Sequence, residues 1–266
     1  MKKNELKATH KDQKHATILG IRIDSTSKDR LLSWINSKIT SRDKFYIVTP
    51  NPEIVLQAQK DKKLAKILNS SDLAIPDGVG IAWAAKLLGQ KPPFSVLKGR
   101  EVFFDLIKLA AEKNWRVFLF GGEGDEAYKS KVRIKKIFNN LEIKVDAGPK
   151  LDKNAEPVSE VDTKIEIDAI AKINNFSPHI LFVALGAPKQ EKWIYKWLPK
   201  LDIGGAMVVG QAFNYFSGKS KPVPLWIEKN SLEWLWRLIT EPWRIKRVFN
   251  ATVVFPLLVI KHKLSR

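Results

Sequence analysis

The sequence predicts an α/β fold in which a doubly wound parallel sheet is flanked by helices and followed by a C-terminal segment of different character. Three observations lead to this prediction. Short apolar runs alternate with segments of helical spacing between residues 17 and 218, which is the order of βαβ units. Several apolar runs end in glycine or small polar residues. Residues 219–266 are basic and rich in tryptophan.

These observations divide the chain into three parts. Residues 1–16 are lysine-rich and mostly polar, so we expect a disordered basic tail. Residues 17–218 carry the alternating pattern and form the predicted catalytic domain. Residues 219–266 form the predicted appendage, which carries 10 Lys and Arg against 3 Asp and Glu.

The elements follow from periodicity and from turn residues. Residues 17–23 alternate as in a short strand, and Pro52 suits the first turn of a helix over about residues 53–69. The predicted strands of the sheet are residues 45–48, 73–75, 116–120, 143–147, 180–185 and 206–209. The other predicted helices include residues 28–41, 83–88, 101–113, 127–138 and 162–174, and one that ends at Trp197.

Ligands bind parallel α/β sheets at the carboxyl ends of the strands, near a topological switch point. Four predicted strand ends carry small or polar residues and should converge on one cleft. They are Thr49-Pro50-Asn51, Pro76-Asp77-Gly78, the glycine-rich run 121–125 and the run 186–191.

Each strand end also has a purely structural interpretation. Gly121 and Gly122 would let backbone amides approach a phosphate, but a plain turn fits them equally well. Asp77 is placed either to cap the next helix or to act as a general base. Thr49 and Asn51 suit either turn chemistry or substrate contacts. Glu191, in the first turn of a helix, complements the helix dipole whether or not it has another role.

The charge of +18 predicts anionic partners: nucleic acid, a lipid surface or a phosphorylated substrate. The chain has no cysteine, so thiolate metal sites and cysteine nucleophiles are excluded. Its 4 histidines do not cluster with carboxylates at metal-ligand spacing, and no Asp-x-Asp pair occurs. We therefore expect no cofactor and chemistry that is independent of metal ions.

The C-terminal segment interleaves tryptophan with basic residues between positions 225 and 247, and an apolar run follows at 251–260. Aromatic rings favour the lipid headgroup level, and Lys and Arg are drawn to anionic lipids. A run of about 10 residues is too short to cross a bilayer, which takes roughly 20. The composition favours equally a helix lying on a membrane and a helix packing its tryptophans on the core.

Taken in order, the motifs resemble one family, the WecG/TagA/CpsF glycosyltransferases. The resemblance covers about residues 17–250 and combines short motifs into a specific set. The motifs are Thr49-Pro50-Asn51-x-Glu53, Pro76-Asp77-Gly78, Gly121-Gly122, Gly186-x-Pro188-Lys189-Gln190-Glu191, Ala212-Phe213, Leu232-Glu233-Trp234-Leu235-x-Arg237-Leu238 and Glu241-Pro242-x-Arg244.

The resemblance implies a Rossmann-like domain with a membrane-associating C-terminal appendage, on the cytoplasmic face of the cell membrane. It implies transfer of N-acetylmannosamine, or a related sugar, from a UDP-activated donor to N-acetylglucosamine on undecaprenyl diphosphate, in the synthesis of teichoic acid or another surface polysaccharide. The expected partners are the UDP-activated amino sugar, the polyprenyl-diphosphate acceptor and an anionic membrane surface. Self-association is expected when no membrane covers the appendage.

The resemblance also implies residue roles. Asp77 matches the family's base, and Thr49, Asn51 and Gln190 match polar cleft residues. Arg237, Arg244 and Arg247 match appendage arginines that reach the diphosphate, and a helix that continued through Pro242 would place them roughly on one face. The residues expected around the nucleotide sugar are Gly121, Gly122, Pro188, Lys189, Gln190, Glu191 and Asn214.

The chain departs from the family pattern at three points near this pocket, one of which is Pro222-Val223-Pro224 in place of the usual Arg-Ala-Pro. The usual Arg-x-x-Gly is Val96-Leu97-Lys98-Gly99, which leaves open whether Lys98 or Arg100 supplies the missing charge. The usual carboxylate after Ala212-Phe213 is the amide of Asn214. Two alternatives stay open at this stage: a family member that has lost activity, and a nucleic-acid-binding protein. The second fits the charge, but the basic and aromatic residues gather at the termini instead of along one groove.

Overall fold

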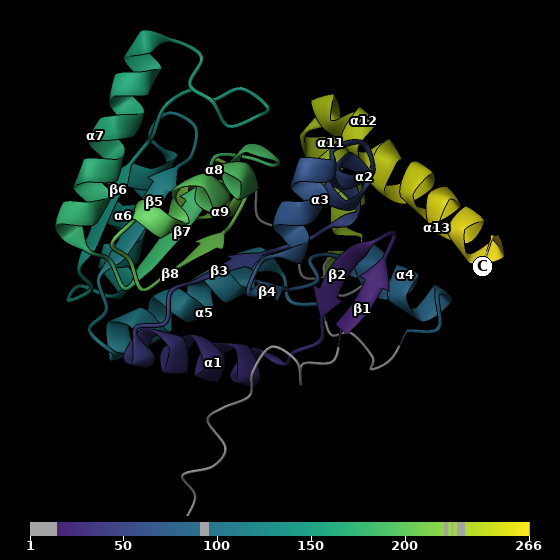
Figure 1. Ribbon diagram of the computed structural model, residues 1–266, viewed down its shortest axis with the longest axis horizontal. Helices are drawn as coiled ribbons and strands as arrows, with labels where there is room; N and C mark the ends of the chain where they lie inside the picture. The colour runs from purple at the N-terminus through teal and green to yellow at the C-terminus, as the bar shows by residue number, and fades with distance from the viewer. Residues whose placement is uncertain (1–14, 91–95, 221–222, 225, 228–231, 266) are drawn as a thin grey trace, which may run out of the picture.

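The computed structural model describes residues 15–90, 96–220, 223–224, 226–227 and 232–265. Its centre is a six-stranded parallel sheet in the order β4-β3-β8-β7-β5-β6, which confirms the predicted fold class (Figure 1). The strands are β3 (Phe45–Val48), β4 (Leu73–Ala74), β5 (Val117–Gly121), β6 (Ile143–Asp146), β7 (Ile180–Ala184) and β8 (Gly205–Val208).

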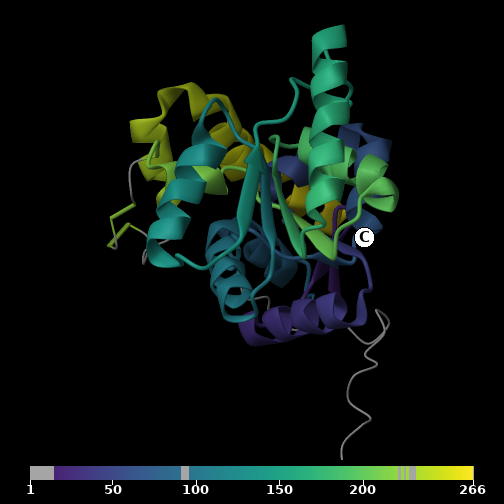
Figure 2. The ribbon, with the colours of Figure 1, turned by 90° about the vertical axis from the view of Figure 1, so that its left-hand side faces the viewer.

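Helices cover both faces of the sheet (Figure 2). Those of the first 218 residues are α1 (Lys28–Ser41), α2 (Pro52–Lys60), α3 (Lys62–Asn69), α4 (Val79–Leu87), α5 (Gly99–Glu112), α6 (Glu126–Ile137), α7 (Glu160–Phe176), α8 (Lys189–Trp197) and α9 (Ala212–Ser217). Alternate strand residues point to opposite faces. In β3, Tyr46 and Val48 belong to the buried cluster that includes residues of α2 and α3, whereas Phe45 and Ile47 belong to the cluster that includes residues of α1 and α5.

The N-terminal strand is a correction to the sequence prediction. Instead of one strand over residues 17–23, the chain forms an antiparallel hairpin of β1 (His15–Ile18) and β2 (Ile21–Asp24). Leu19 and Gly20 both adopt positive φ, which reverses the chain direction between the strands. β1 begins inside the predicted tail, with Ala16 fully buried. Residues 1–14 lie outside the described residues.

The helix predicted over residues 53–69 is divided into α2 and α3. Asp61 is extended at the junction, with φ −128° and ψ 92°, and its carboxylate accepts the Leu64 N–H as the cap of α3. The Lys192 ammonium lies 2.6 Å from the same carboxylate. A capping aspartate satisfies the free amides of a new helix start, so the chain bends where a continuous apolar spacing predicted one helix.

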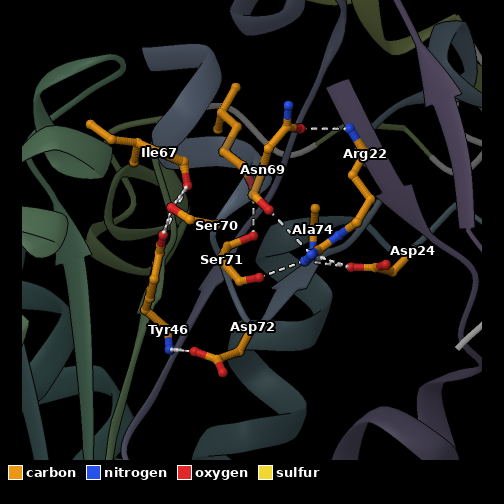
Figure 3. A network of polar contacts seen from close by, with 10 residues as sticks. Arg22, Asp24, Tyr46, Ile67, Asn69, Ser70, Ser71, Asp72 and Ala74 are labelled. Atoms are coloured by element: carbon orange, nitrogen blue, oxygen red, sulfur yellow. Dashed lines mark hydrogen bonds and ion pairs between the residues drawn. The ribbon is translucent and has the colours of Figure 1, made fainter. Parts of the chain in front are cut away.

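A polar network fastens the hairpin to the edge of the sheet (Figure 3). The Asp24 carboxylate is buried, accepts the Ala74 N–H at 2.8 Å and pairs with the Arg22 guanidinium at 3.2 Å. Arg22 also donates to the Ser71 carbonyl at 2.5 Å. These bonds satisfy the backbone beside β4 and fix the position of the strand from which Asp77 emerges.

The C-terminal segment folds back onto the domain (Figure 1). It contains α11 (Glu233–Thr240), a 3₁₀ turn (Pro242–Arg244), α12 (Ile245–Phe249), a π-helical turn (Asn250–Val254) and α13 (Phe255–Leu264). Phe255 and Val259 are fully buried in the core cluster that includes α2 and α4. Leu257 is 61% exposed and Leu264 is 82% exposed. The apolar run therefore divides between core packing and exposed surface.

Within the described ranges, no helix has the length and apolar character needed to span a bilayer.

Candidate active site

A cavity of about 530 Å³ lies at the carboxyl edge of the sheet, between the strand ends and the C-terminal segment. The ends of β3, β4 and β7 contribute to it as predicted, through Thr49, Asp77 and Gly186. The fourth contribution comes from the end of β8, at Val209 to Gln211, and not from the glycine-rich end of β5. The sheet order explains this correction, because β8 lies between β3 and β7 whereas β5 lies beyond β7.

Gly121 and Gly122 do not line this cavity. Both have positive φ, near 98° and 89°. A Cβ on Gly121 would lie 2.8 Å from the Ala184 carbonyl, and one on Gly122 would lie 3.3 Å from the Phe213 ring. The two glycines thus allow β5 to end in close contact with β7 and α9. A phosphate bound at these two glycines would therefore lie outside this cavity.

Asp77 is held in place by hydrogen bonds to backbone groups after β3 and at the start of α5. Its N–H donates to the Pro50 carbonyl at 3.0 Å, and its carboxylate accepts the Gly99 N–H at 3.4 Å. The cap of α4 is Gly78, with no side-chain hydrogen bond, so Asp77 does not cap the helix that follows it. Burial raises the pKa of Asp77, against the lowering effects of the Gly99 N–H and the Arg237 charge.

Thr49, Asn51 and Gln190 all line the same cavity. Asn51 also has the structural role considered above, because its Oδ1 accepts the Ile54 N–H at 3.0 Å and caps α2. Gln190 lies in the first turn of α8 and is 3% exposed. Its Oε1 accepts the Gly210 N–H at 3.2 Å, which links the ends of β7 and β8 across the floor of the cavity.

Arg237, Arg244 and Arg247 line the cavity, but they do not share one continuous helix. The chain leaves α11 before Pro242, which removes a helical N–H, and re-forms a helix at α12. Arg237 donates to Gln211 and, at 2.9 Å, to the Tyr215 hydroxyl. The other two pair with carboxylates: Arg244 with Glu241, and Arg247 with Glu53 at 2.8 Å.

Lys98 and Arg100 both lie at the cavity, and one carboxylate from the C-terminal segment binds both. Glu233 lies 2.6 Å from the Lys98 ammonium and accepts two hydrogen bonds from Arg100, at 2.6 and 3.2 Å. Burial alone would raise the pKa of Glu233, but the bonds from Arg100 and Lys98 outweigh it and hold the pKa below its usual range. Position, therefore, does not favour either cation as the replacement for the family arginine.

Tyr215 lies between two cations of the cavity, Arg100 of α5 and Arg237 of α11. Its ring centroid lies 4.9 Å from the Arg100 guanidinium carbon and 5.4 Å from that of Arg237. Sequence reasoning missed this residue, and it missed Gln211 and the ion-pairing role of Glu233. β8, like the other strands at the cavity, is followed by a small residue, Gly210. Including this strand end among those expected to face the cleft would have pointed to Gln211 and α9.

Besides Gly121 and Gly122, three more residues predicted around the nucleotide sugar lie away from the cavity lining. Pro188 precedes the first turn of α8, and Lys189 begins that helix. Asn214 faces the buried Glu126 carboxylate of α6, to which its NH₂ donates when the amide is oriented accordingly. An aspartate at position 214 would bring two carboxylates together there, which gives a physical reason for the amide in this chain.

Among the residues that the structure describes, no three His, Cys, Asp or Glu side chains come together as a metal-binding group.

Comparison with known proteins shows the class of this molecule. The model of the glycosyl transferase WecG/TagA/CpsF family matches residues 16–266, so the chain belongs to this family and is a glycosyltransferase. The match includes the C-terminal segment that closes the cavity. The resemblance first seen in the motifs is thereby confirmed.

Curated relatives support this assignment along most of their length. One from Bacillus spizizenii is 33% identical over 218 residues, which cover 82% of this chain and 79% of the relative. One from Bacillus subtilis is 30% identical over 88% of this chain and 91% of the relative. One from Staphylococcus aureus is 26% identical over 94% of both. Each is named N-acetylglucosaminyldiphosphoundecaprenol N-acetyl-beta-D-mannosaminyltransferase.

Proposed function

We propose that this chain transfers N-acetylmannosamine from a UDP-activated donor to N-acetylglucosamine carried on undecaprenyl diphosphate. The product would serve teichoic acid or a related surface polysaccharide. The observation that carries the proposal is the position of Asp77, a partly buried carboxyl that shares one cavity with Lys98, Arg100 and Arg237. The names of the three relatives supply the sugar and the acceptor.

Asp77 acts as the general base in this proposal. Its carboxylate takes the proton of an acceptor hydroxyl, and the hydroxyl oxygen forms a bond to the anomeric carbon of the donor sugar. The bond from that carbon to the UDP oxygen breaks, and its electron pair leaves with UDP. A base is most effective when its pKa lies near the working pH, and burial moves the pKa of Asp77 upward, toward neutrality.

The cations around the cavity stabilise the leaving group. Charge develops on the diphosphate as the bond to UDP breaks, and guanidinium groups bind phosphate oxygens through paired N–H donors. Arg237 is held in position by Gln211 and Tyr215 before any substrate arrives. Donors fixed in advance stabilise a transition state more than donors that must reorganise. A single displacement of this kind inverts the configuration at the anomeric carbon.

The C-terminal segment is the proposed contact with the membrane, at its cytoplasmic face. Trp243 is 76% exposed, and exposed apolar side chains recur from α11 to α13. Lys261 and Lys263 are exposed near the end of α13. Apolar and basic groups together favour an anionic lipid surface, where the polyprenyl acceptor would be held. The same exposed surface would drive self-association of the chain without lipid.

Release of UDP from a panel of donors tests the proposed reaction. The full-length chain is incubated with UDP-N-acetylmannosamine, UDP-N-acetylglucosamine or UDP-N-acetylgalactosamine and a short-chain lipid diphosphate of N-acetylglucosamine. We expect acceptor-dependent UDP release to be fastest with UDP-N-acetylmannosamine. Equal rates with and without acceptor would contradict the proposed transfer, and no turnover with any donor would favour an inactive family member.

Asp77→Asn should lower turnover by roughly 10²–10⁴-fold, the usual span for loss of a general base. Donor binding should survive, because the amide keeps the shape of the side chain. The wild-type rate should also fall as the pH drops through the pKa of Asp77, since the base must be ionised. Initial rates across pH measure both effects. Turnover near the wild-type level in Asp77→Asn would remove the general-base assignment.

Chelation should leave most of the activity intact, because we assign the stabilisation of the leaving group to side-chain cations. The measurement compares UDP release by the full-length chain before and after treatment with EDTA. Abolition of activity by EDTA, with recovery on addition of Mg²⁺ or Mn²⁺, would show that a metal ion has this role.

A further inference from the structure

The cavity wall contains a second buried carboxyl, Glu191, that the proposed mechanism does not use. Glu191 is 2% exposed, lies in the first turn of α8 and lines the cavity beside Gln190. Its position in the helix explains a favourable interaction with the helix dipole, but not its burial against the substrate cavity.

One oxygen of Glu191 fixes the orientation of Gln190. The Gln190 Nε2 donates to Glu191 Oε1 at 2.9 Å, while the Gln190 Oε1 accepts the Gly210 N–H at 3.2 Å. An amide with one partner on its nitrogen side and another on its oxygen side cannot flip without losing both bonds. Glu191 therefore determines which way the Gln190 amide faces.

The other oxygen, Glu191 Oε2, is buried, and among the residues that the structure describes it has no hydrogen-bond partner. A buried polar atom without a partner carries a substantial energetic cost. A small turn of the carboxyl toward the cavity would let a bound ligand relieve that cost. Burial raises the pKa of Glu191 to about 7, so the carboxyl carries a proton in a large fraction of molecules near neutral pH.

Few charges act on this carboxyl. Lys192 lowers its pKa, but the Lys192 ammonium is directed to Asp61 and to the Lys153 carbonyl. The other charged side chains that line the cavity are Glu53, Asp77, Lys98, Arg100, Glu233, Arg237, Arg244 and Arg247. A protonated carboxyl is a hydrogen-bond donor, and an ionised one repels phosphate. The wall at Glu191 thus suits a neutral group better than the diphosphate.

We propose that Glu191 contacts the transferred sugar, donating a hydrogen bond from Oε2 to a neutral oxygen of that sugar, such as its acetamido carbonyl, while Oε1 positions Gln190. This inference rests on the proposed function and specifies which part of the donor is recognised by Glu191, one of the residues expected around the nucleotide sugar. It predicts that the sugar, and not the uridine or the diphosphate, is the part of the donor whose binding depends on the protonation of this carboxyl.

Calorimetric binding of UDP-N-acetylmannosamine to the full-length chain, from about pH 6 to about pH 9, tests the inference. The wild-type affinity should fall roughly tenfold as Glu191 ionises, about the effect of one good hydrogen bond. Glu191→Gln keeps an N–H donor and does not titrate, so its affinity should lack this component. Asp77 ionises in both proteins, and the difference between their profiles isolates Glu191.

Two controls accompany the measurement. Glu166→Gln makes the same substitution at a buried glutamate that accepts N–H bonds from Trp193 and Trp197 and does not line the cavity. Its pH profile should match the wild type. UDP alone should bind wild-type protein and Glu191→Gln with the same pH dependence, because it lacks the sugar.

Parallel pH profiles for wild type and Glu191→Gln with the sugar nucleotide would overturn the role of Glu191 and leave the proposed reaction intact. A pH step specific to Glu191 with UDP alone would overturn the assignment to the sugar. If wild-type protein bound UDP but none of the UDP-amino sugars at any pH, the proposed function itself would fail, and the inference with it.

Discussion

The ion pairs of Glu233 are the interaction on which the candidate site depends. This carboxylate lies on α11 and binds Lys98 and Arg100 at the start of α5. It therefore joins the C-terminal segment to the sheet domain at the rim of the cavity. Arg237, one turn further along α11, adds a second connection through Gln211 and Tyr215. Because both connections are partly buried, solvent screens them less than surface pairs.

The same contacts determine the electrostatics of the site. Strand ends supply polar and acidic groups, and the C-terminal segment supplies Arg237, Arg244 and Arg247. Each arginine is held by a carboxylate, an amide or a tyrosine, so contacts within the protein position these cations at the cavity. A diphosphate would thus meet cations that need little rearrangement. The long sequence separation between Asp77 and Arg237 is bridged by the return of the chain over the carboxyl edge of the sheet.

Periodicity was sufficient to predict most of the sheet and its helices, because apolar strands and amphipathic helices leave local signals. The boundaries of α1 and β3 agree with the predicted residues 28–41 and 45–48. Strand order depends on pairing between segments that lie far apart in the sequence. It places the end of β8 at the cavity, in place of the glycines at 121–122. The break at Asp61 depended on a capping bond that competes with a continuous helical pattern.

The candidate site was predictable where a motif marks a strand end, as at Asp77 and Gln190. It was not predictable where a tertiary contact gives an ordinary residue its role, as for Tyr215 and Glu233.

The central claim is that the C-terminal segment completes the active site as well as contacting a membrane. Arg237→Gln in the full-length chain tests it, by turnover on a water-soluble acceptor without vesicles. The matched control is Lys246→Gln, which removes an exposed cation of the same segment outside the cavity. We predict that Arg237→Gln lowers turnover roughly 10²-fold, while Lys246→Gln stays near wild type. Equal turnover in the two variants would contradict a catalytic role for the segment.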